Sequence, residues 1–179
     1  MKNQSLSMSS EAGFTLIELL VVVIMVGILS AIAIPGWLGF MNRQRLSTAQ
    51  KQTLALIRNA QANAQREKTS WQVCFSDDGT QVLSSAQPVP SDNTCSTTTW
   101  QPLIDKDSKY IKFTSTMIQS SNGYNRVQFN YDGSVVSPQV SGLLNYNITF
   151  MPRTTGNPRA CVSVKTLLGA TGYGPNACN

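Results

Sequence analysis

Residues 13–37 read GFTLIELLVVVIMVGILSAIAIPGW, and this stretch governs how the rest of the chain is interpreted. Residues 14–34 are long enough, at about 1.5 Å per residue, for a helix that crosses the hydrocarbon core of a bilayer. One carboxylate, Glu18, lies inside the stretch, although a charged side chain at the centre of a bilayer costs about 3 kcal/mol. The stretch predicts a membrane-spanning helix whose glutamate needs a specific role.

The apolar stretch differs from a cleaved secretory signal. Such a signal has a basic start, a short apolar core and a small-residue cleavage site after that core. Here Lys2 is the only basic residue ahead of the stretch, and IPGW at 34–37 leads into more helix-favouring sequence. We therefore expect residues 14–35 to be retained as a transmembrane or filament-core helix.

Residues 36–68 are expected to continue this helix as an amphipathic half. Pro35 removes one backbone hydrogen bond, so it predicts a kinked or loosened stretch with the glycines that follow it. Positions 43–68 hold six basic residues and one acidic residue, which we interpret as a solvated face near anionic lipid. Apolar residues at helical spacing are expected to pack under a globular head: Leu38, Met41, Leu46, Ala49, Leu54, Ile57, Ala60 and Ala64.

Residues 69–179 change to short alternating segments and predict a β-rich globular head. Six or seven strands at this spacing favour an antiparallel sandwich or twisted sheets, so the fold class is α+β. Residues 84–102 are rich in Ser, Thr and Pro, and we expect them to form a surface loop. The expected strands cover 71–75, 80–83, 110–114, 126–130, 134–136, 145–151 and 161–164.

Four cysteines lie in the predicted head. The chain has no histidine and no C-x-x-C spacing, so a metal site is not expected. We pair Cys74 with Cys95 and Cys161 with Cys178, although four cysteines allow three connectivities. The second pair would attach an otherwise loose tail, residues 166–179, to the last strand. Disulfides indicate an oxidising compartment, which outweighs the opposite orientation that the basic residues after the anchor would favour.

The string GFTLIE at 13–18 resembles the signal of type IV pilins and of the pseudopilins of type II secretion. In that family a prepilin peptidase cuts after the glycine, here between Gly13 and Phe14, and the new amino terminus is N-methylated. The resemblance implies a leader of residues 1–13 and a methylated Phe14. It also implies an assembly role for Pro35, which matches the family's proline in the mature helix.

The resemblance gives Glu18 its role. During assembly its carboxylate would meet the amino group of Phe14 on a neighbouring subunit, because opposite charges attract strongly where the dielectric constant is low. The implied partners are other pilins through the N-terminal helix, the prepilin peptidase, the inner-membrane assembly platform and the lipid bilayer. The implied location is the bacterial inner membrane, crossed once, with the head periplasmic or extracellular and the subunit later assembled in a pilus or pseudopilus.

Three stretches of the head resemble the minor pilins of the GspH/FimT/FimU type. They are VQFNYDG at 127–133, NITF at 147–150 and RACVSV at 159–164. The resemblance implies a minor pilin that joins or primes a type IV pilus, in a structural and assembly role, with motility or DNA uptake as the process served. A major pilin, a pseudopilin of type II secretion and a DNA-binding tip pilin or adhesin are the alternatives.

DNA binding and catalysis are both disfavoured by the sequence. Some relatives bind DNA through a G-R-x-R motif, but the region here reads GNPR at 156–159 and lacks the second arginine. Arg153, Arg159 and Lys165 are the cations that could contact phosphates. Without histidine, a G-x-S-x-G motif or a G-x-x-x-x-G-K-[ST] motif, no enzymatic activity, catalytic residue or cofactor is expected.

Overall fold

One long helix, α1 (Leu16–Glu67), runs through the first third of the protein. The computed structural model describes residues 13–136 and 143–174. The chain forms two units, residues 1–40 and residues 41–179. We call the described part of the first unit the N-terminal segment (residues 13–40) and the second unit the head unit (residues 41–179). The predicted long helix is confirmed, and α1 continues through Pro35 without interruption.

Both ends of α1 have local causes in the sequence. At its start the Glu18 N–H donates to the Thr15 hydroxyl at 3.3 Å, which is the spacing of a capping box. The Leu19 N–H donates to the Thr15 carbonyl at 3.2 Å and closes the first turn. At its end Lys68 has a φ of 54°, the left-handed conformation that commonly ends helices.

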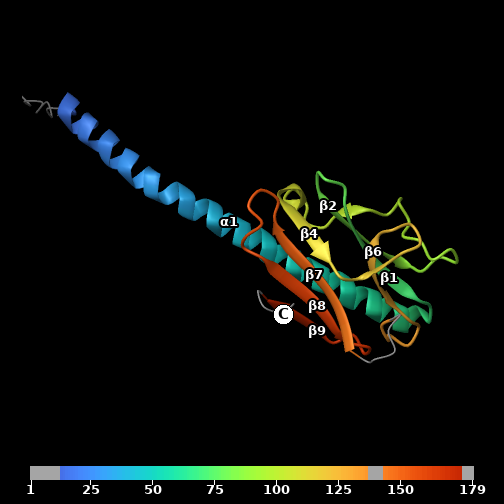
Figure 1. The fold of residues 1–179 in the computed structure, drawn as a ribbon. Helices are drawn as coiled ribbons and strands as arrows, with labels where there is room; N and C mark the ends of the chain where they lie inside the picture. The colour runs from blue at the N-terminus through green and yellow to red at the C-terminus, as the bar shows by residue number, and fades with distance from the viewer. Residues whose placement is uncertain (1–12, 137–142, 175–179) are drawn as a thin grey trace, which may run out of the picture. The chain divides into compact units, whose positions relative to one another are not determined.

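Two antiparallel sheets follow the helix in the chain and belong to the head unit (Figure 1). A short 3₁₀ turn, η1 (Ser108–Tyr110), precedes the first strand of the second sheet. From edge to edge, the first sheet contains β3 (Gln101–Pro102), β2 (Val82–Pro88), β1 (Trp71–Asp77), β6 (Asn125–Phe129) and β5 (Ile118–Gln119). The second sheet contains β4 (Ile111–Ser115), β7 (Leu143–Pro152), β8 (Ala160–Thr166) and β9 (Thr171–Gly174).

The second part of α1 shares one hydrophobic core with both sheets. Three aromatic rings link the sheets inside this core: Phe113 of β4 lies 6.4 Å from Phe75 of β1 and 6.3 Å from Phe150 of β7, measured between ring centroids. Most of the predicted helical stripe is buried in it, namely Leu46, Ala49, Leu54, Ile57, Ala60 and Ala64. The remaining two members, Leu38 and Met41, lie at the start of the stripe and are not buried.

Two glutamines of α1 hold two turns of the head unit through their backbone. Gln61 Nε2 donates to the Gly133 carbonyl at 2.9 Å and to the Leu168 carbonyl at 3.0 Å. Gln65 Nε2 donates to the Asp132 carbonyl at 3.1 Å. Gly133 has a φ of 85°, and a Cβ added to it would lie 2.2 Å from Gln65 Nε2. Both the conformation and the close approach require glycine at this turn.

Two parts of the sequence prediction for the head are wrong. The predicted surface loop begins too early, because Ser84–Pro88 is the end of β2, and Ser84, Ser85 and Gln87 are buried. Ser85 and Gln87 are tolerated there because the segment that follows covers them and supplies hydrogen bonds, such as the 2.5 Å contact between the hydroxyls of Ser85 and Thr99. The expected loose tail contains β9, whose four residues pair with β8.

Candidate functional site

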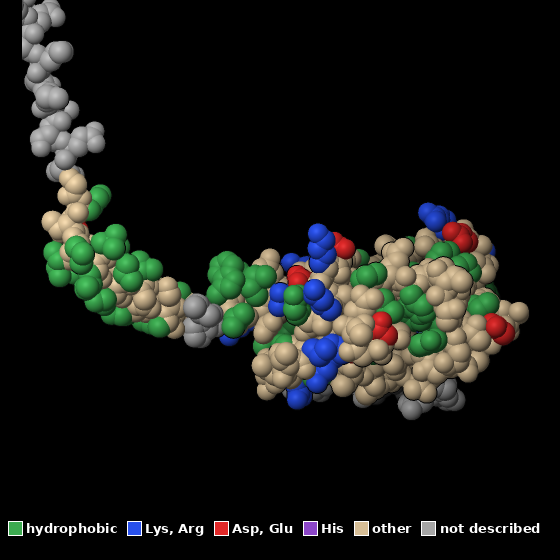
Figure 2. Space-filling model, turned by 90° about the horizontal axis from the view of Figure 1, so that it is seen from above, with side chains coloured by type: hydrophobic (Ala, Val, Ile, Leu, Met, Phe, Trp, Pro, Cys, Tyr) green, Lys and Arg blue, Asp and Glu red, His purple; other side chains and the backbone are tan. Residues whose placement is uncertain are grey.

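The N-terminal segment presents its apolar side chains without cover. The large apolar side chains that the structure describes there, in residues 14–33 and 36–40, are 45% to 85% exposed, and by length and composition α1 can cross a membrane. Figure 2 shows hydrophobic side chains along much of the visible face of this segment, whereas those on the head unit are scattered among polar ones. A continuous apolar surface of this size indicates contact with lipid or with another protein.

Glu18 is the one acidic residue of this apolar segment. Its side chain is exposed, and among the described residues no cation forms an ion pair with it. Its backbone N–H is capped by Thr15, and a carboxylate in the first turn is favoured by the partial positive charge at a helix N-terminus. The local fold therefore explains why a glutamate suits this turn, but leaves its charge uncompensated by another side chain.

The predicted cleavage point lies just ahead of the helix. Gly13, Phe14 and Thr15 are not helical, and Phe14 is 85% exposed. A Cβ added to Gly13 would meet no atom within 4 Å. A peptide bond in exposed, non-helical backbone can be reached by a protease, so the geometry permits cleavage here. The remainder of the predicted leader lies outside the described residues.

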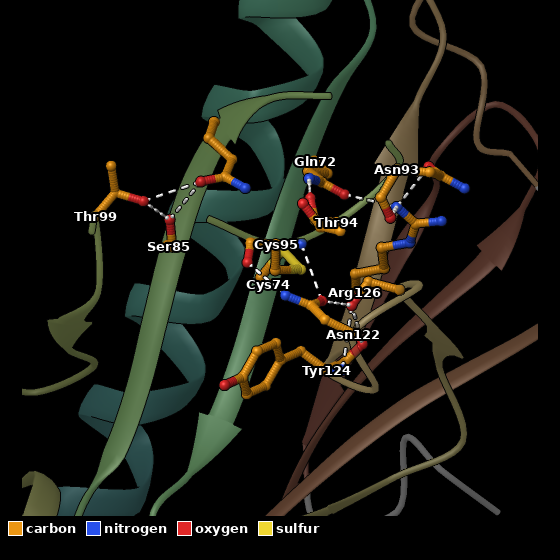
Figure 3. Close-up of a disulfide and its surroundings, with 12 residues drawn as sticks. Gln72, Cys74, Ser85, Asn93, Thr94, Cys95, Thr99, Asn122, Tyr124 and Arg126 are labelled. Atoms are coloured by element: carbon orange, nitrogen blue, oxygen red, sulfur yellow. Dashed lines mark hydrogen bonds between the residues drawn. A yellow bond between two sulfur atoms is a disulfide. The ribbon is translucent and has the colours of Figure 1, made fainter. Parts of the chain in front are cut away.

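A disulfide joins Cys74 of β1 to Cys95, which confirms the first predicted pair. The two Cα atoms lie 6.2 Å apart, and both residues are buried. Cys95 belongs to the segment 89–100, which connects β2 to β3 and covers the face of the first sheet that points away from α1 (Figure 3). The bond therefore fastens this covering segment to the middle strand of the sheet.

Amide groups hold the same segment on either side of the disulfide (Figure 3). Gln72 Nε2 donates to the Thr94 carbonyl at 2.6 Å. Asn122 accepts from the Cys95 N–H at 3.1 Å and donates back to the Cys95 carbonyl at 2.8 Å. Since both partners are backbone groups of the covering segment, these hydrogen bonds fix its path as well as its attachment.

Arg126 of β6 completes this network, and no pattern in the sequence predicts its role. It is 4% exposed, and its Nη1 donates to Gln72 Oε1 at 2.9 Å and to Asn93 Oδ1 at 2.8 Å. Burial lowers the pKa of the Arg126 guanidinium, because desolvation disfavours the charged form. Alternation with the buried Val127 puts Arg126 on the outer face of the strand, where an arginine is ordinarily solvated. Only the covering segment makes that face an interior.

Two aspartates accept hydrogen bonds within tight turns of the head unit. Asp78 Oδ1 accepts from the Thr80 hydroxyl and from the N–H groups of Thr80 and Gln81, all at 2.7 Å. The hydrogen bond from the Thr80 hydroxyl is the main cause that lowers the pKa of Asp78. Likewise, the hydrogen bonds from Ser134 lower the pKa of Asp132. Both carboxylates therefore favour their charged form in the folded protein.

Comparison with known proteins bears first on the N-terminal segment. Residues 8–34 match the family described as the prokaryotic N-terminal methylation motif. Two fimbrial proteins of Pseudomonas aeruginosa are each 32% identical to this chain over 131 residues, which cover 72% of the chain and 66% of the relative. A fimbrial protein of Moraxella nonliquefaciens is 36% identical over 70 residues, which cover 39% of this chain and 42% of the relative.

The chain belongs to the pilin family. The recognition made from GFTLIE is thereby confirmed. The chain spans just under two thirds of the length of the Pseudomonas relatives that it matches. Among solved structures, the type IV minor pilin FimU of Pseudomonas aeruginosa is similar with a TM-score of 0.49 and 16% identity, over 78% of this chain and 99% of FimU.

The second predicted disulfide of this pilin is only partly within the described residues. Cys161 of β8 is buried and disulfide-bonded. Its predicted partner, Cys178, lies outside the described residues. The register of β8 and β9 pairs Cys161 with Gly174. The sequence predicted a role for Cys161 in closing the C-terminal region, and the bonded state of its sulfur agrees with that role.

The three candidate DNA contacts of this pilin do not form one cluster. Arg153 is engaged inside the head unit, because its Nη2 lies 2.8 Å from both Asp77 Oδ1 and the Ile111 carbonyl oxygen. Arg159 lies just ahead of β8 and Lys165 lies near its end; both are exposed, and their separation of six residues corresponds to about 20 Å in extended backbone. A single stretch of backbone phosphates would meet these cations separately.

Proposed function

We propose that this protein is a minor pilin that is held in the inner membrane by its N-terminal segment and then enters a type IV pilus. The observation that carries the proposal is the apolar surface of residues 14–33 and 36–40, which nothing in the described chain covers. Such a surface is stable in a bilayer or against the same surface of neighbouring subunits. The methylation motif and the fimbrial relatives support packing against neighbouring subunits as well as insertion in the bilayer.

Processing prepares the segment for assembly in this proposal. A prepilin peptidase removes residues 1–13, and Phe14 becomes a methylated amino terminus. The Glu18 carboxylate of one subunit then pairs with the Phe14 ammonium of its neighbour, since Glu18 has no ion-pair partner among the described residues. Pro35 would add local adaptability to the helix where subunits pack. The disulfide-bonded head unit lies outside the cytoplasm.

The minor-pilin assignment rests on the three head stretches that resemble the GspH/FimT/FimU type. They fall on β6 and the turn after it, on β7 and on β8, so all three lie in or beside the sheets of the head unit. A minor subunit is expected to occur in sheared pili far below the amount of the major subunit, which quantitative mass spectrometry can measure. An abundance equal to that of the main filament protein would make this chain a major pilin.

The decisive test combines the mature mass with an assembly assay. Protein from its native membrane is expected to begin at methylated Phe14 and to lack thiols. Glu18→Ala is expected to remain in the membrane fraction but to disappear from sheared filaments, whereas Glu67→Ala, at the other end of α1, should enter them. A chain that still begins at Met1, or a Glu18→Ala chain that enters filaments normally, would contradict the proposal.

A pseudopilin of type II secretion is the second candidate, because the N-terminal segment suits both machines equally. Deletion of the gene is expected to abolish or reduce surface pili and to leave protein secretion intact. The reverse result would assign the chain to secretion. A DNA-binding tip pilin is the third candidate, and salt-dependent DNA retention by the full chain that Arg159→Gln weakens would favour it.

A further inference from the structure

A groove of about 300 Å³ lies in the head unit between α1 and the residues that lead into β8. Its walls are largely apolar: Leu46 of α1 and Ala160 of β8 are buried, and Pro158 also lines it. Gln50 Nε2 donates to the Cys161 carbonyl at 2.8 Å and so joins the helix to the strand beside the groove. The groove is therefore a built feature of the folded head unit.

Two uncompensated arginines line this groove. Arg43 comes from α1 and Arg159 from the loop before β8, both are exposed, and neither forms a hydrogen bond or an ion pair among the described residues. Arg45, two residues along the helix, is different: its Nε lies 3.1 Å from Asp107 Oδ1, and its guanidinium stacks 4.0 Å above the Tyr110 ring. The groove thus combines apolar walls with two arginines that have no anionic partner among the described residues.

The chain itself brings Arg43 close to the end of the N-terminal segment. Arg43 follows Phe40 by three residues, so their Cα atoms lie within about 11 Å however the two units are arranged. Trp37, which is 64% exposed, is the kind of residue that gathers at membrane–water interfaces. Long arginine side chains near such a boundary reach toward the headgroups. An anchored chain therefore holds Arg43 at the level of lipid phosphates.

We propose that the groove binds the headgroup of an anionic glycerophospholipid while the unassembled subunit is anchored in the membrane. Arg43 and Arg159 donate charge-assisted hydrogen bonds to the phosphate. Leu46 and Pro158 contact the glycerol and the first methylenes of the acyl chains. The inference rests on the proposed function, because only an anchored chain keeps the groove at a bilayer surface. The bound headgroup would fix the orientation of the head unit on the membrane before the subunit is assembled.

The distribution of charge on the head unit agrees with this assignment. On the face shown in Figure 2, most of the Lys and Arg side chains gather at one end of the head unit. Within the groove itself no Asp or Glu is among the lining residues. The basic side chains would therefore attract an anionic lipid from a distance, and the two groove arginines would bind it on contact.

The test uses the full chain in lipid nanodiscs that contain equal amounts of phosphatidylethanolamine and phosphatidylglycerol. Native mass spectrometry then counts the lipids that stay bound when the protein is released. The wild type is expected to retain phosphatidylglycerol preferentially, and Arg43→Gln with Arg159→Gln to lower its apparent affinity by roughly ten-fold for each arginine. Lys51→Gln with Arg58→Gln is the matched control, since it removes the same charge from exposed positions that do not line the groove.

Several results would overturn the inference. An equal loss in both double variants would show general surface attraction in place of a site. A lower thermal midpoint of the groove variant in lipid-free detergent would show that an acidic group of the chain itself occupies the arginines. Unchanged lipid retention with loss of filament entry would assign the groove to a neighbouring subunit. Wild-type chains that insert without preferring phosphatidylglycerol refute this inference alone, whereas chains that fail to insert also refute the proposed function.

Discussion

The two parts of α1 share one helical backbone and differ in what surrounds them. In the N-terminal segment the apolar side chains are exposed, whereas in the head unit the apolar stripe is buried under two sheets. Ile24 is 53% exposed and Ile57 is 0% exposed on the same helix. Burial stabilises by about 25 cal/mol per Å² of apolar surface. The head unit already has this stabilisation, and the N-terminal segment must obtain it from lipid or from other subunits.

The two parts of α1 suit two different surroundings. An apolar face all round suits lipid or a filament core, and a one-sided stripe suits a globular protein. The head unit begins at Met41, and Leu46 is the first residue of α1 that belongs to its core. If the surroundings alone differ, a change in one part of α1 should leave the other part unaffected.

The largest effect is expected when the N-terminal segment is removed. A chain that begins at Met41 keeps every member of the described core cluster, so we expect it to fold and to stay in solution. Membrane fractionation should find the full chain with the membrane and the shortened chain in the soluble fraction. Circular dichroism with thermal unfolding should show β structure and one cooperative transition. Aggregation or a non-cooperative transition would mean that the head unit depends on the segment.

The same substitution in the two parts of α1 should give opposite results. Ile57→Ala leaves a cavity in the core and is expected to lower the free energy of unfolding by about 3 kcal/mol. Ile24→Ala changes an uncovered position and should shift it by less than about 0.5 kcal/mol. Urea unfolding of the full chain in mild detergent, followed by tryptophan fluorescence, measures both. Equal losses would show that the two parts of the helix are energetically coupled.

The covering segment 89–100 should depend on its disulfide more than on any one hydrogen bond. Replacing Cys74 and Cys95 by alanine opens a loop with a sequence separation of 21 and should cost about 3 kcal/mol. Asn122→Ala keeps the bond and removes two hydrogen bonds to Cys95, with an expected loss of about 1 kcal/mol. Thermal unfolding compares the variants. If the cysteine variant loses no more than Asn122→Ala, the amide network alone holds the segment.

The smallest effect is expected from pH. The pKa values of Asp78 and Asp132 are lowered in the folded head unit. Their contribution to the free energy of unfolding is therefore complete above the unfolded pKa of about 4, and it is lost as pH falls through the folded pKa values. The chain has no histidine, so the thermal midpoint should be nearly constant from about pH 5 to pH 9. Asp78→Asn with Asp132→Asn should reduce the decrease of the thermal midpoint at acid pH. An unchanged decrease would show that other carboxylates cause it.

Much of the architecture follows from local patterns in the sequence. The length of α1, the six buried members of its stripe and the cores of β1, β6, β7 and β8 come from hydrophobic periodicity and turn residues. The end of β2 was not predictable in this way, because Ser85 and Gln87 gain their burial from contact with the segment that follows the strand, and hydrophobic periodicity does not reveal such contacts. Short edge strands such as β3 and β5 carry too few residues to show a period.

Some residues of the candidate site are likewise predictable from a local motif, and others are not. Gly13, Phe14 and Glu18 stand out because their signal is a short contiguous motif, and Cys74 and Cys95 because cysteine has few alternatives outside the cytoplasm. Arg126 could not be found, since its role depends on the segment that covers it. The groove at Arg43 and Arg159 also escaped notice, because the fold brings together residues that are far apart in the chain.

The glutamine contacts of α1 have a consequence for how the surface of this pilin can vary. Gln61 and Gln65 bind carbonyl oxygens of the turns at 132–133 and 168, which every amino acid provides. Apart from Gly133 and Gly169, whose added Cβ atoms would collide with these glutamines, side chains on the two turns can change without releasing them from the helix. Exposed positions such as Tyr131 and Leu168 can therefore differ between related pilins while the glutamine hydrogen bonds that hold the two turns on α1 stay the same.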